Sequence, residues 1–310
     1  MAKSLVVLTT SLTILFLAVG CHPAKPQPAE TQTVEQTTVE PPKLETTEPQ
    51  PKKPKQPPTV SFHDKCADIL TSYVDDAGMV DYNTLKYKKV KLKKLLEEFD
   101  NLDPNQYNAW PQRDKIAFWI NAYNIQMLNI IIENYPIESS RILRLFWPPN
   151  SIRHIKGIWS NYKFIVMDEE FTLIQLERRF FRKEFDEPRA FFALCNASLS
   201  SPPLRNEPYY GHKLNQQLDD QVKRFLSSPR ALEIDQNAKV VRLSAVLQPT
   251  WFGSEFISKY AIDKKFKDHP PPVRAVLNFI TNYISEQDVR FLETENYTIE
   301  YIKYDWTLNG

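Results

Sequence analysis

The sequence predicts an α+β fold, in which a single globular domain holds a central buried helix and a small mixed or antiparallel sheet. Three observations lead to this class. Helical and strand-like segments mix without the regular spacing of βαβ units. The segment Asp114–Tyr135 carries apolar residues on nearly every face, which is typical of a buried helix. No proline-rich break and no internal repeat divides residues 59–310, so we expect one domain there.

The other elements follow from hydrophobic periodicity and from residues that begin or end helices. Pro136 disfavours helical geometry at Tyr135, so the central helix should end there. A proline in the first turn of a helix loses no hydrogen bond, which supports a helix that begins at Pro272. We expect further helices at Phe62–Val74, Tyr82–Phe99, Leu173–Phe185, Leu214–Leu226 and Pro272–Ile284. We expect strands at Tyr162–Met167, Arg189–Asn196, Val240–Leu243 and Tyr297–Tyr304.

The N-terminus has the pattern of an export signal. Lys3 is followed by an apolar run from Leu5 to Val19, which is shorter than the ~20 residues that a membrane-spanning helix needs. The tetrapeptide A-V-G-C that ends at Cys21 resembles the lipobox of bacterial lipoproteins. That resemblance implies that residues 1–20 are a signal peptide and that Cys21 carries lipid, which would hold the protein on a membrane. An ordinary signal peptide with an incidental cysteine is the alternative.

Residues 21–58 differ from both of their neighbours. After Cys21 the segment consists largely of Pro, Thr, Glu, Gln and Lys, and it contains no aromatic residue and no glycine. Such a composition buries too little apolar surface to fold, so we expect a disordered tether, with a proline-rich docking ligand as the alternative. His22 stands where an Asp would resemble an inner-membrane retention signal. The predicted location after secretion is therefore the outer membrane, facing the periplasm.

Composition limits the partners and cofactors. The net charge of +1 leaves no broad basic surface for nucleic acid, so we expect no nucleic-acid partner. A basic run from Lys86 to Lys94 forms either a solvated helix face or a contact with anionic lipid or another envelope polyanion. Cys66 and Cys195 could form one disulfide in an oxidising envelope. No Cys/His cluster has the spacing of a structural zinc site, and we expect no metal and no cofactor.

Six motifs occur in order through the predicted domain. They are Y-V-D-D-A-G-M-V-D-Y (Tyr73–Tyr82), A-F-W-I-N-A-Y-N (Ala117–Asn124), L-E-R-R (Leu176–Arg179), P-R-A-F-F-A-L-C-N-A-S-L-S-S-P-P-L (Pro188–Leu204), W-F-G-S-E-F (Trp251–Phe256) and Y-D-W-T-L-N (Tyr304–Asn309). On these motifs the chain resembles the family catalogued as domain of unknown function 547, from about Cys66 to the C-terminus. The biochemistry of that family is largely unassigned.

The resemblance implies a chemistry that this chain has altered. The family usually carries a His and a Cys around the segment matched by Pro188–Leu204, with another His after the glutamate matched by Glu177. A thiol beside a His can be an activated nucleophile, so the family looks like possible thiol hydrolases or acyl transferases. The altered positions here are Phe191 and Arg178 in place of the histidines, Cys195-Asn196 in place of N-C, and Ser201 in place of a second Cys. In a strand, the one-residue shift would turn the thiol to the opposite face.

Cys195 is the candidate catalytic residue. Without a base its thiol would be mostly protonated at neutral pH, since a free cysteine titrates at about 8.5. His212 or His154 could supply that base, or Cys195 could be a small buried hydrophobic residue. The alternative nucleophiles Ser198, Ser200 and Ser201 lack the G-x-S-x-G elbow of serine hydrolases.

A ligand pocket is expected where polar and aromatic residues of the matched motifs converge. The candidate ligand-binding residues are Trp119, Asn121, Asn124, Glu177, Arg189, Asn196, Ser198, Trp251 and Glu255. Alternatively, Asn121 and Asn124 brace a neighbouring loop, and Arg189 forms an ion pair with Glu177. We therefore expect a binding or scaffolding module for a small molecule, a peptide or another envelope component. A thiol-dependent enzyme and a mechanical tether between membrane and cell wall are the alternatives.

Overall fold

The computed structural model describes residues 61–262 and 265–310, and for residues 249–252 it describes the backbone alone. The predicted signal peptide, Cys21 and the predicted tether lie outside the described residues. Within the described ranges, helices and two small sheets form an α+β fold, as the sequence predicts. None of the helices in these ranges is long and apolar enough to cross a membrane.

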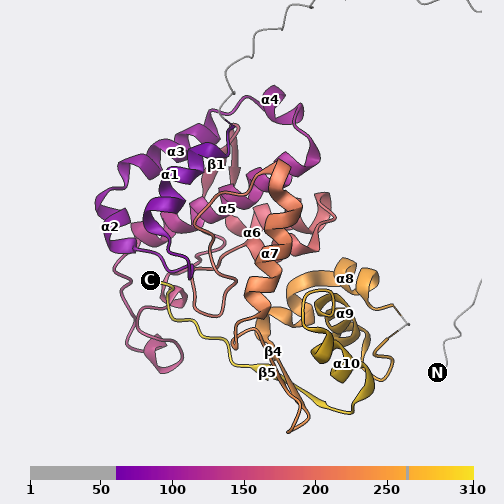
Figure 1. Cartoon of the computed structure of the whole chain (residues 1–310). Coiled ribbons are helices and arrows are strands. Elements are labelled where there is room, and N and C mark those ends of the chain that lie inside the picture. Colours follow the sequence, from indigo (N-terminus) through magenta and orange to yellow (C-terminus); the bar gives the residue numbers. More distant parts are fainter. Residues whose placement is uncertain (1–60, 263–264) are drawn as a thin grey trace, which may run out of the picture. The chain divides into compact units, whose positions relative to one another are not determined.

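The buried hydrophobic residues of the described chain form two cores, and one helix runs through the centre of the first. α5 (Gln112–Glu133) is buried without interruption from Ile116 to Ile132, because apolar side chains cover all of its faces. α2 (Tyr82–Tyr87) and α3 (Val90–Asp100) pack against α5, and α1 (Asp64–Tyr73) packs against both of them (Figure 1). The predicted central buried helix is thereby confirmed.

Two of the predicted helices are interrupted. The segment 82–99 forms α2 and α3 rather than one helix, because the chain turns at Lys88 and Lys89. The predicted helix at 173–185 begins as α6 (Leu173–Leu176) and continues as a wider π-helix, η3 (Glu177–Glu184). π-helical turns are rare in proteins and are frequent at functional sites. The L-E-R-R motif begins at Leu176, the last residue of α6, and continues into η3.

A three-stranded sheet supports the second core. β3 (Leu232–Asp235) pairs antiparallel with β4 (Val240–Ser244), and β4 pairs parallel with β5 (Thr298–Ile302). Val241 and Leu243 alternate toward the buried face, as expected for a sheet with one covered side. The sheet is therefore mixed. The separate hairpin of β1 (Phe164–Val166) and β2 (Glu169–Phe171) is antiparallel and contacts α3.

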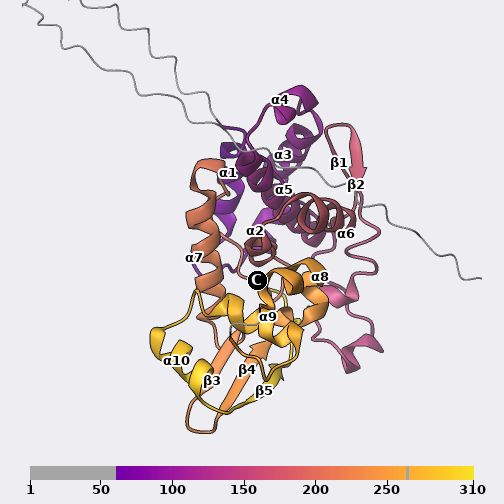
Figure 2. The ribbon, with the colours of Figure 1, turned by 90° about the vertical axis from the view of Figure 1, so that its right-hand side faces the viewer.

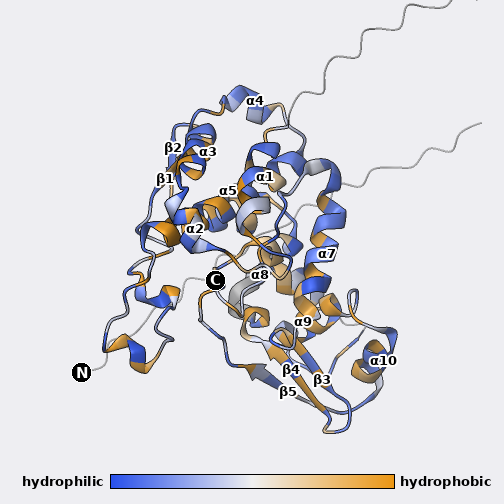
Figure 3. Cartoon of the chain, turned by 60° about the vertical axis from the view of Figure 1, so that its left-hand side comes forward, coloured by the Kyte–Doolittle hydropathy of each residue, from blue (hydrophilic) through white to orange (hydrophobic). Residues whose placement is uncertain are grey.

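Helices cover the buried face of the three-stranded sheet, as Figure 2 shows for α9 (Pro271–Ile280) and α10 (Glu286–Thr294). α7 (Leu214–Leu226) has the predicted bounds and is amphipathic, with its hydrophilic face turned outward in Figure 3. Its apolar face contributes to both cores. The remaining elements are α4 (Pro104–Asn108), α8 (Pro249–Tyr260), η1 (Leu143–Leu145), η2 (Ile152–His154), η4 (Pro188–Ala193), η5 (Gly211–Lys213) and η6 (Ala245–Leu247).

The predicted strand at Arg189–Asn196 is wrong. Most of this segment belongs to η4, a 3-10 helix, and the chain then continues to Asn196 without joining either sheet of the described residues. Pro188 fits the first turn of η4, and the carboxylate of Glu187 accepts a hydrogen bond from the N–H of Arg189. Cys195 and Asn196 therefore do not point to opposite faces of a strand, and both side chains are buried.

Candidate functional site

Residues 194–201, which we call the motif loop, are held by an asparagine of the central helix. Asn124 donates from Nδ2 to the carbonyl oxygen of Ala193 (2.8 Å) and accepts at Oδ1 from the N–H of Cys195 (2.9 Å). Its amide thus satisfies backbone groups that a neighbouring strand would pair in a sheet. Ala197, with φ +49°, then turns the chain into the serines of the loop. Asn124 therefore braces the loop.

Asn121 braces a second segment in the same way. Its Nδ2 donates to the carbonyl oxygen of Tyr209 (2.9 Å), and its Oδ1 accepts from the N–H of Tyr209 (2.9 Å). The amide also lies 3.3 Å from Nδ1 of the buried His63, whose Nε2 is 3.4 Å from Asp114. Burial lowers the pKa of His63, and the carboxylate of Asp114 opposes that shift. These contacts suit a neutral imidazole that accepts at Nδ1 and donates at Nε2.

The thiol of Cys195 is sealed inside the domain. The residue is 3 % exposed, and its Sγ accepts hydrogen bonds from the N–H of Ala197 (3.4 Å) and from Nδ2 of Asn309 (3.8 Å). Burial raises the pKa of the Cys195 thiol, and the Ala197 N–H partly opposes the rise. Cys66 is also buried, and both thiols are free, so the disulfide considered from the sequence is not formed. An activated thiol needs a lowered pKa, and this environment acts in the opposite direction.

The two histidines considered as bases are engaged elsewhere. Nε2 of His154 lies 2.8 Å from the carbonyl oxygen of Pro148, and the ring of His212 packs against Tyr210 with centroids 5.4 Å apart. No hydrogen bond or ring contact of the described chain joins either histidine to Cys195. Nor do the described residues contain a group of three or more His, Cys, Asp or Glu placed to hold a metal ion.

The polar side chains of the motif loop are paired by aromatic residues. Oδ1 of Asn196 accepts from the hydroxyl of Tyr123 (3.0 Å) and from Nε1 of Trp159 (3.1 Å). The hydroxyl of Ser198 lies 2.8 Å from that of Tyr304. Asn196 and Ser198 were both predicted to bind a ligand, and both lie largely inside the protein.

The C-terminal tail closes the motif loop from the other side. The hydroxyl of Ser200 accepts from the N–H of Asp305 (2.9 Å). Near the end of the chain, Oδ1 of Asn309 accepts from the hydroxyl of Tyr82 (2.7 Å), and its Nδ2 donates to the carbonyl oxygen of Gly78 (3.0 Å). Residues of three sequence motifs, Tyr73–Tyr82, Pro188–Leu204 and Tyr304–Asn309, therefore meet here, and their hydrogen bonds join distant segments of the chain.

Two further predicted ligand residues lie apart from this loop. Trp119 is buried, stacks on Phe180 with ring centroids 3.7 Å apart, and donates from Nε1 to the hydroxyl of Tyr107. Arg189 pairs with Glu187 and Asp219 rather than with Glu177. The ion pair that we considered between Arg189 and Glu177 is therefore not present.

Glu177 and Glu255 belong to another part of the surface. Glu177 pairs with Arg182 (2.7 Å), whose guanidinium lies 5.3 Å from the ring centroid of Phe191. Glu255 and Phe191 line a cavity of about 230 Å³ between η3, η4 and α8. The side chain of Trp251 lies outside the described residues. The described candidates are thus distributed among the core, the motif loop and this second cavity instead of forming one pocket.

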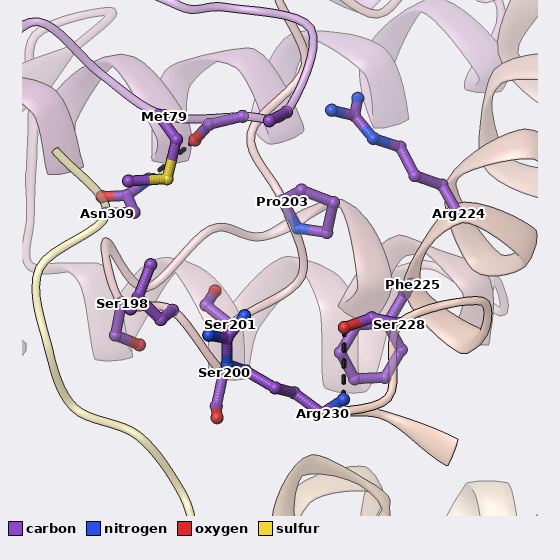
Figure 4. A pocket seen from close by; sticks show the side chains of 13 residues that line it. Met79, Ser198, Ser200, Ser201, Pro203, Arg224, Phe225, Ser228, Arg230 and Asn309 are labelled. Carbon is purple, nitrogen blue, oxygen red and sulfur yellow. Dashed lines mark hydrogen bonds between the residues drawn. The ribbon is translucent and has the colours of Figure 1, made fainter. Parts of the chain in front are cut away.

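A cavity of about 250 Å³ opens beside the motif loop. Figure 4 shows Ser198, Ser200 and Ser201 on one side of it, and Arg224 and Phe225 from the end of α7 on the other. The turn around residue 78 and the C-terminal tail complete its wall. Of the ligand residues predicted from the sequence, Ser198 lines this cavity. The buried thiol of Cys195 is not part of its lining.

Two arginines that were not among the predicted site residues line this cavity. Arg224 and Arg230 are its only charged lining residues. Arg224 donates to the carbonyl oxygen of Asp76, and among the described residues no carboxylate forms a salt bridge with either guanidinium. In the sequence, Arg224 resembles the solvated face of α7, and Arg230, which follows that helix, resembles any exposed turn residue. Only the fold brings them beside the serines.

A profile of the family described as "Protein of unknown function, DUF547" matches residues 107–226. This range contains the central helix, η3, the motif loop and α7. No curated protein and no solved structure matches the chain. By this match, and by the motifs that lie within it, the chain resembles the DUF547 family.

Proposed function

We propose that this chain is a lipoprotein of a bacterial cell envelope whose domain binds a small anionic ligand and does not catalyse a reaction on it. Anchoring is supported by the lipobox-like A-V-G-C at Cys21 and by the proline-rich segment that follows. His22 favours the outer membrane, facing the periplasm. The observation that carries the binding role is the cavity beside the motif loop, which is lined by Arg224 and Arg230, and neither guanidinium forms a salt bridge with a described residue.

The state of the thiol favours binding over catalysis. Thiol chemistry needs a thiolate, which a nearby base or cation makes available by lowering the pKa. Burial raises the pKa of Cys195, and Phe191 and Arg178 occupy the positions that match the family's histidines. A thiol hydrolase or acyl transferase therefore has less support from these contacts than a binding module.

The lining of the cavity selects for a carboxylate or a phosphate. A guanidinium presents paired N–H donors that match the oxygens of both groups. The hydroxyl of Ser228 offers a further hydrogen bond, and Phe225 and Met79 offer apolar contact. At about 250 Å³ the cavity is smaller than most pockets for drug-sized molecules. The ligand is therefore a small molecule, or a larger one such as a peptide that inserts only its charged end.

Succinate and inorganic phosphate are suitable probes of this cavity. Either anion should raise the temperature of thermal unfolding of the full chain, because a ligand that binds the folded state stabilises it. Arg230→Gln should raise the apparent dissociation constant about tenfold or more, since a hydrogen bond to a charged group contributes about 1.5–3 kcal/mol. Arg178→Gln removes an exposed arginine away from the cavity and should keep the wild-type constant. Equal effects of the two variants, or no shift with either anion, would contradict the proposal.

Alkylation kinetics test the absence of thiol chemistry. At about pH 6 the thiol of Cys195 should react with iodoacetamide far more slowly than free cysteine, because its pKa is raised. The extent of reaction can be followed by mass spectrometry of the peptide that carries the residue. Faster reaction than free cysteine would indicate an ionised thiol and would favour the thiol-dependent enzyme.

The mechanical tether has little support from the basic run. Lys91 pairs with Asp68 and Lys93 pairs with Glu133, so part of the run is neutralised by acids of the same domain. A polyanion that bound there would have to compete with these ion pairs.

A further inference from the structure

A protrusion, defined as residues 139–156, exposes large apolar side chains away from the cavity and outside the six motifs. Ile142, Leu145 and Phe146 are 72 %, 81 % and 69 % exposed. The segment projects at the lower left of Figure 1, below α2 and on the opposite side from α7. Single exposed apolar residues are common on proteins, whereas a cluster of them marks an interaction site.

The base of the protrusion is packed, which holds the tip out in solvent. Ile152 and Ile155 are buried in the first core. The guanidinium of Arg153 lies 4.7 Å from the ring centroid of Trp147 and 5.1 Å from that of Trp306, which belongs to the C-terminal tail. The exposed tip residues Ile142, Leu145 and Phe146 take no part in this packing, although they are close in sequence to the packed residues.

Within the protrusion the charged side chains have one sign. Arg141, Arg144, Arg153 and Lys156 are all exposed, and the protrusion contains no Asp or Glu. None of the four forms a salt bridge with a residue of the described ranges. An exposed apolar tip, flanked by cations that form no salt bridge within the described ranges, is complementary to a surface with anionic groups outermost and an apolar layer beneath them.

We infer that the protrusion docks on the surface of an anionic lipid bilayer. Its apolar side chains enter the boundary between headgroups and acyl chains, and its cationic side chains lie among the lipid phosphates. A second copy of the chain is a poorer occupant, because two such tips would bring like charges together. The inference goes beyond the proposed function, since it involves neither the cavity nor the acyl chains on Cys21.

A fluorophore beside the tip tests the inference directly. In the full chain with Cys21→Ser, Cys66 and Cys195 are buried, so Asn150→Cys supplies an exposed thiol for an NBD label. Vesicles that contain phosphatidylglycerol should move the NBD emission to shorter wavelength, and vesicles of phosphatidylcholine alone should not. The matched control carries the label at Glu286→Cys. This position is exposed at the start of α10, a helix that packs on the second core, and the emission wavelength of its label should not change.

Substitutions then separate the apolar from the ionic contribution, in the same Cys21→Ser chain so that the N-terminal segment contributes equally throughout. Replacing Ile142, Leu145 and Phe146 together with serine should weaken binding about a hundredfold or more. Replacing Arg141 and Arg144 with glutamine should weaken binding to phosphatidylglycerol vesicles about tenfold or more, and added salt should weaken wild-type binding. Equal emission changes at both labels, or unchanged affinity of the triple serine variant, would overturn the inference. A lipid-independent dimer that the triple variant loses in sedimentation would overturn it too, because it would make a second copy the occupant.

Discussion

The motif loop and the protrusion use their side chains in opposite ways. In the motif loop, buried polar groups are paired within the chain, as where Asn124 holds the backbone at Cys195 and Tyr304 meets Ser198. In the protrusion, Leu145 and Phe146 stand in solvent. The motif loop thus joins distant segments of the domain and contributes serines to the wall of the cavity, whereas the exposed apolar surface lies where the sequence shows no motif.

Burial accounts for this difference. A buried loop must pair its backbone N–H and C=O groups inside the protein, so side chains around it are selected for their hydrogen bonds. Asn121 and Asn124 meet that demand from one face of α5, and each satisfies both a carbonyl oxygen and an N–H. An exposed loop pairs its backbone with water. Its side chains are therefore free to suit a partner outside the chain.

Among the substitutions that test this difference, Asn124→Ala should cause the largest loss in the free energy of unfolding. The substitution leaves the carbonyl oxygen of Ala193 and the N–H of Cys195 buried without their partner, and each lost pairing costs about 1–3 kcal/mol. We expect the free energy of unfolding to fall by about 3 kcal/mol in urea denaturation. The protrusion should be unaffected, because it has no contact with this amide.

Asn101→Ala is the matched control for that substitution. Asn101 is exposed and makes one side-chain hydrogen bond, to the carbonyl oxygen of Glu97 (2.8 Å). Its replacement should change the free energy of unfolding by less than about 1 kcal/mol. If the two alanine variants lose the same stability, Asn124 does not brace the motif loop.

A smaller and pH-dependent change in stability should come from His63, which lies beside Asn121. Burial lowers the pKa of His63 below its ordinary value of 6.5, although Asp114 and Asp64 oppose the shift and His212 adds to it. Below pH 6.5 the unfolded chain therefore binds a proton at His63 that the folded chain binds only at lower pH. Stability should be full above pH 6.5 and decrease as the pH falls toward the lowered pKa. Urea midpoints at successive pH values measure the slope.

Two variants test the assignment of that slope. His63→Gln should flatten the dependence between neutral pH and the carboxylate range, because the titrating group is gone. Asp114→Asn should steepen it, because the carboxylate that raises the pKa of His63 is removed. A slope that His63→Gln leaves unchanged would show that the decrease arises from other groups.

The sequence was sufficient to predict the helices whose pattern of apolar residues determines which faces are buried. α5 is apolar on every face and α7 is cleanly amphipathic, and both were predicted close to their true bounds. η4 was predicted as a strand because P-R-A-F-F-A-L-C-N is a short apolar run, and periodicity alone does not separate a buried strand from a buried helical turn. In the fold, the amide of Asn124, which is distant in the sequence, pairs with backbone groups at the end of this segment.

The candidate site was less accessible from the sequence. The bracing interpretation of Asn121 and Asn124 follows from their position on an apolar helix, because a buried amide must find partners. Arg224 and Arg230 carry no local signal, since an arginine near a helix end resembles any solvated residue. The protrusion was missed because exposure is a property of the fold. Its apolar residues have the same composition as a core segment.

The smallest change in the free energy of unfolding should come from Leu145→Ser, and this variant is the sharpest test of the contrast between the protrusion and the motif loop. The side chain is 81 % exposed, so in the absence of lipid its loss should change the free energy of unfolding by less than about 0.5 kcal/mol. Leu128→Ser makes the same chemical change at a side chain that is 1 % exposed on α5, and it should cost about 3 kcal/mol or more in the same urea titration. A loss above about 1 kcal/mol for Leu145→Ser would mean that the tip packs against the chain itself. Its apolar surface would then be part of the fold, and the contrast with the motif loop would disappear.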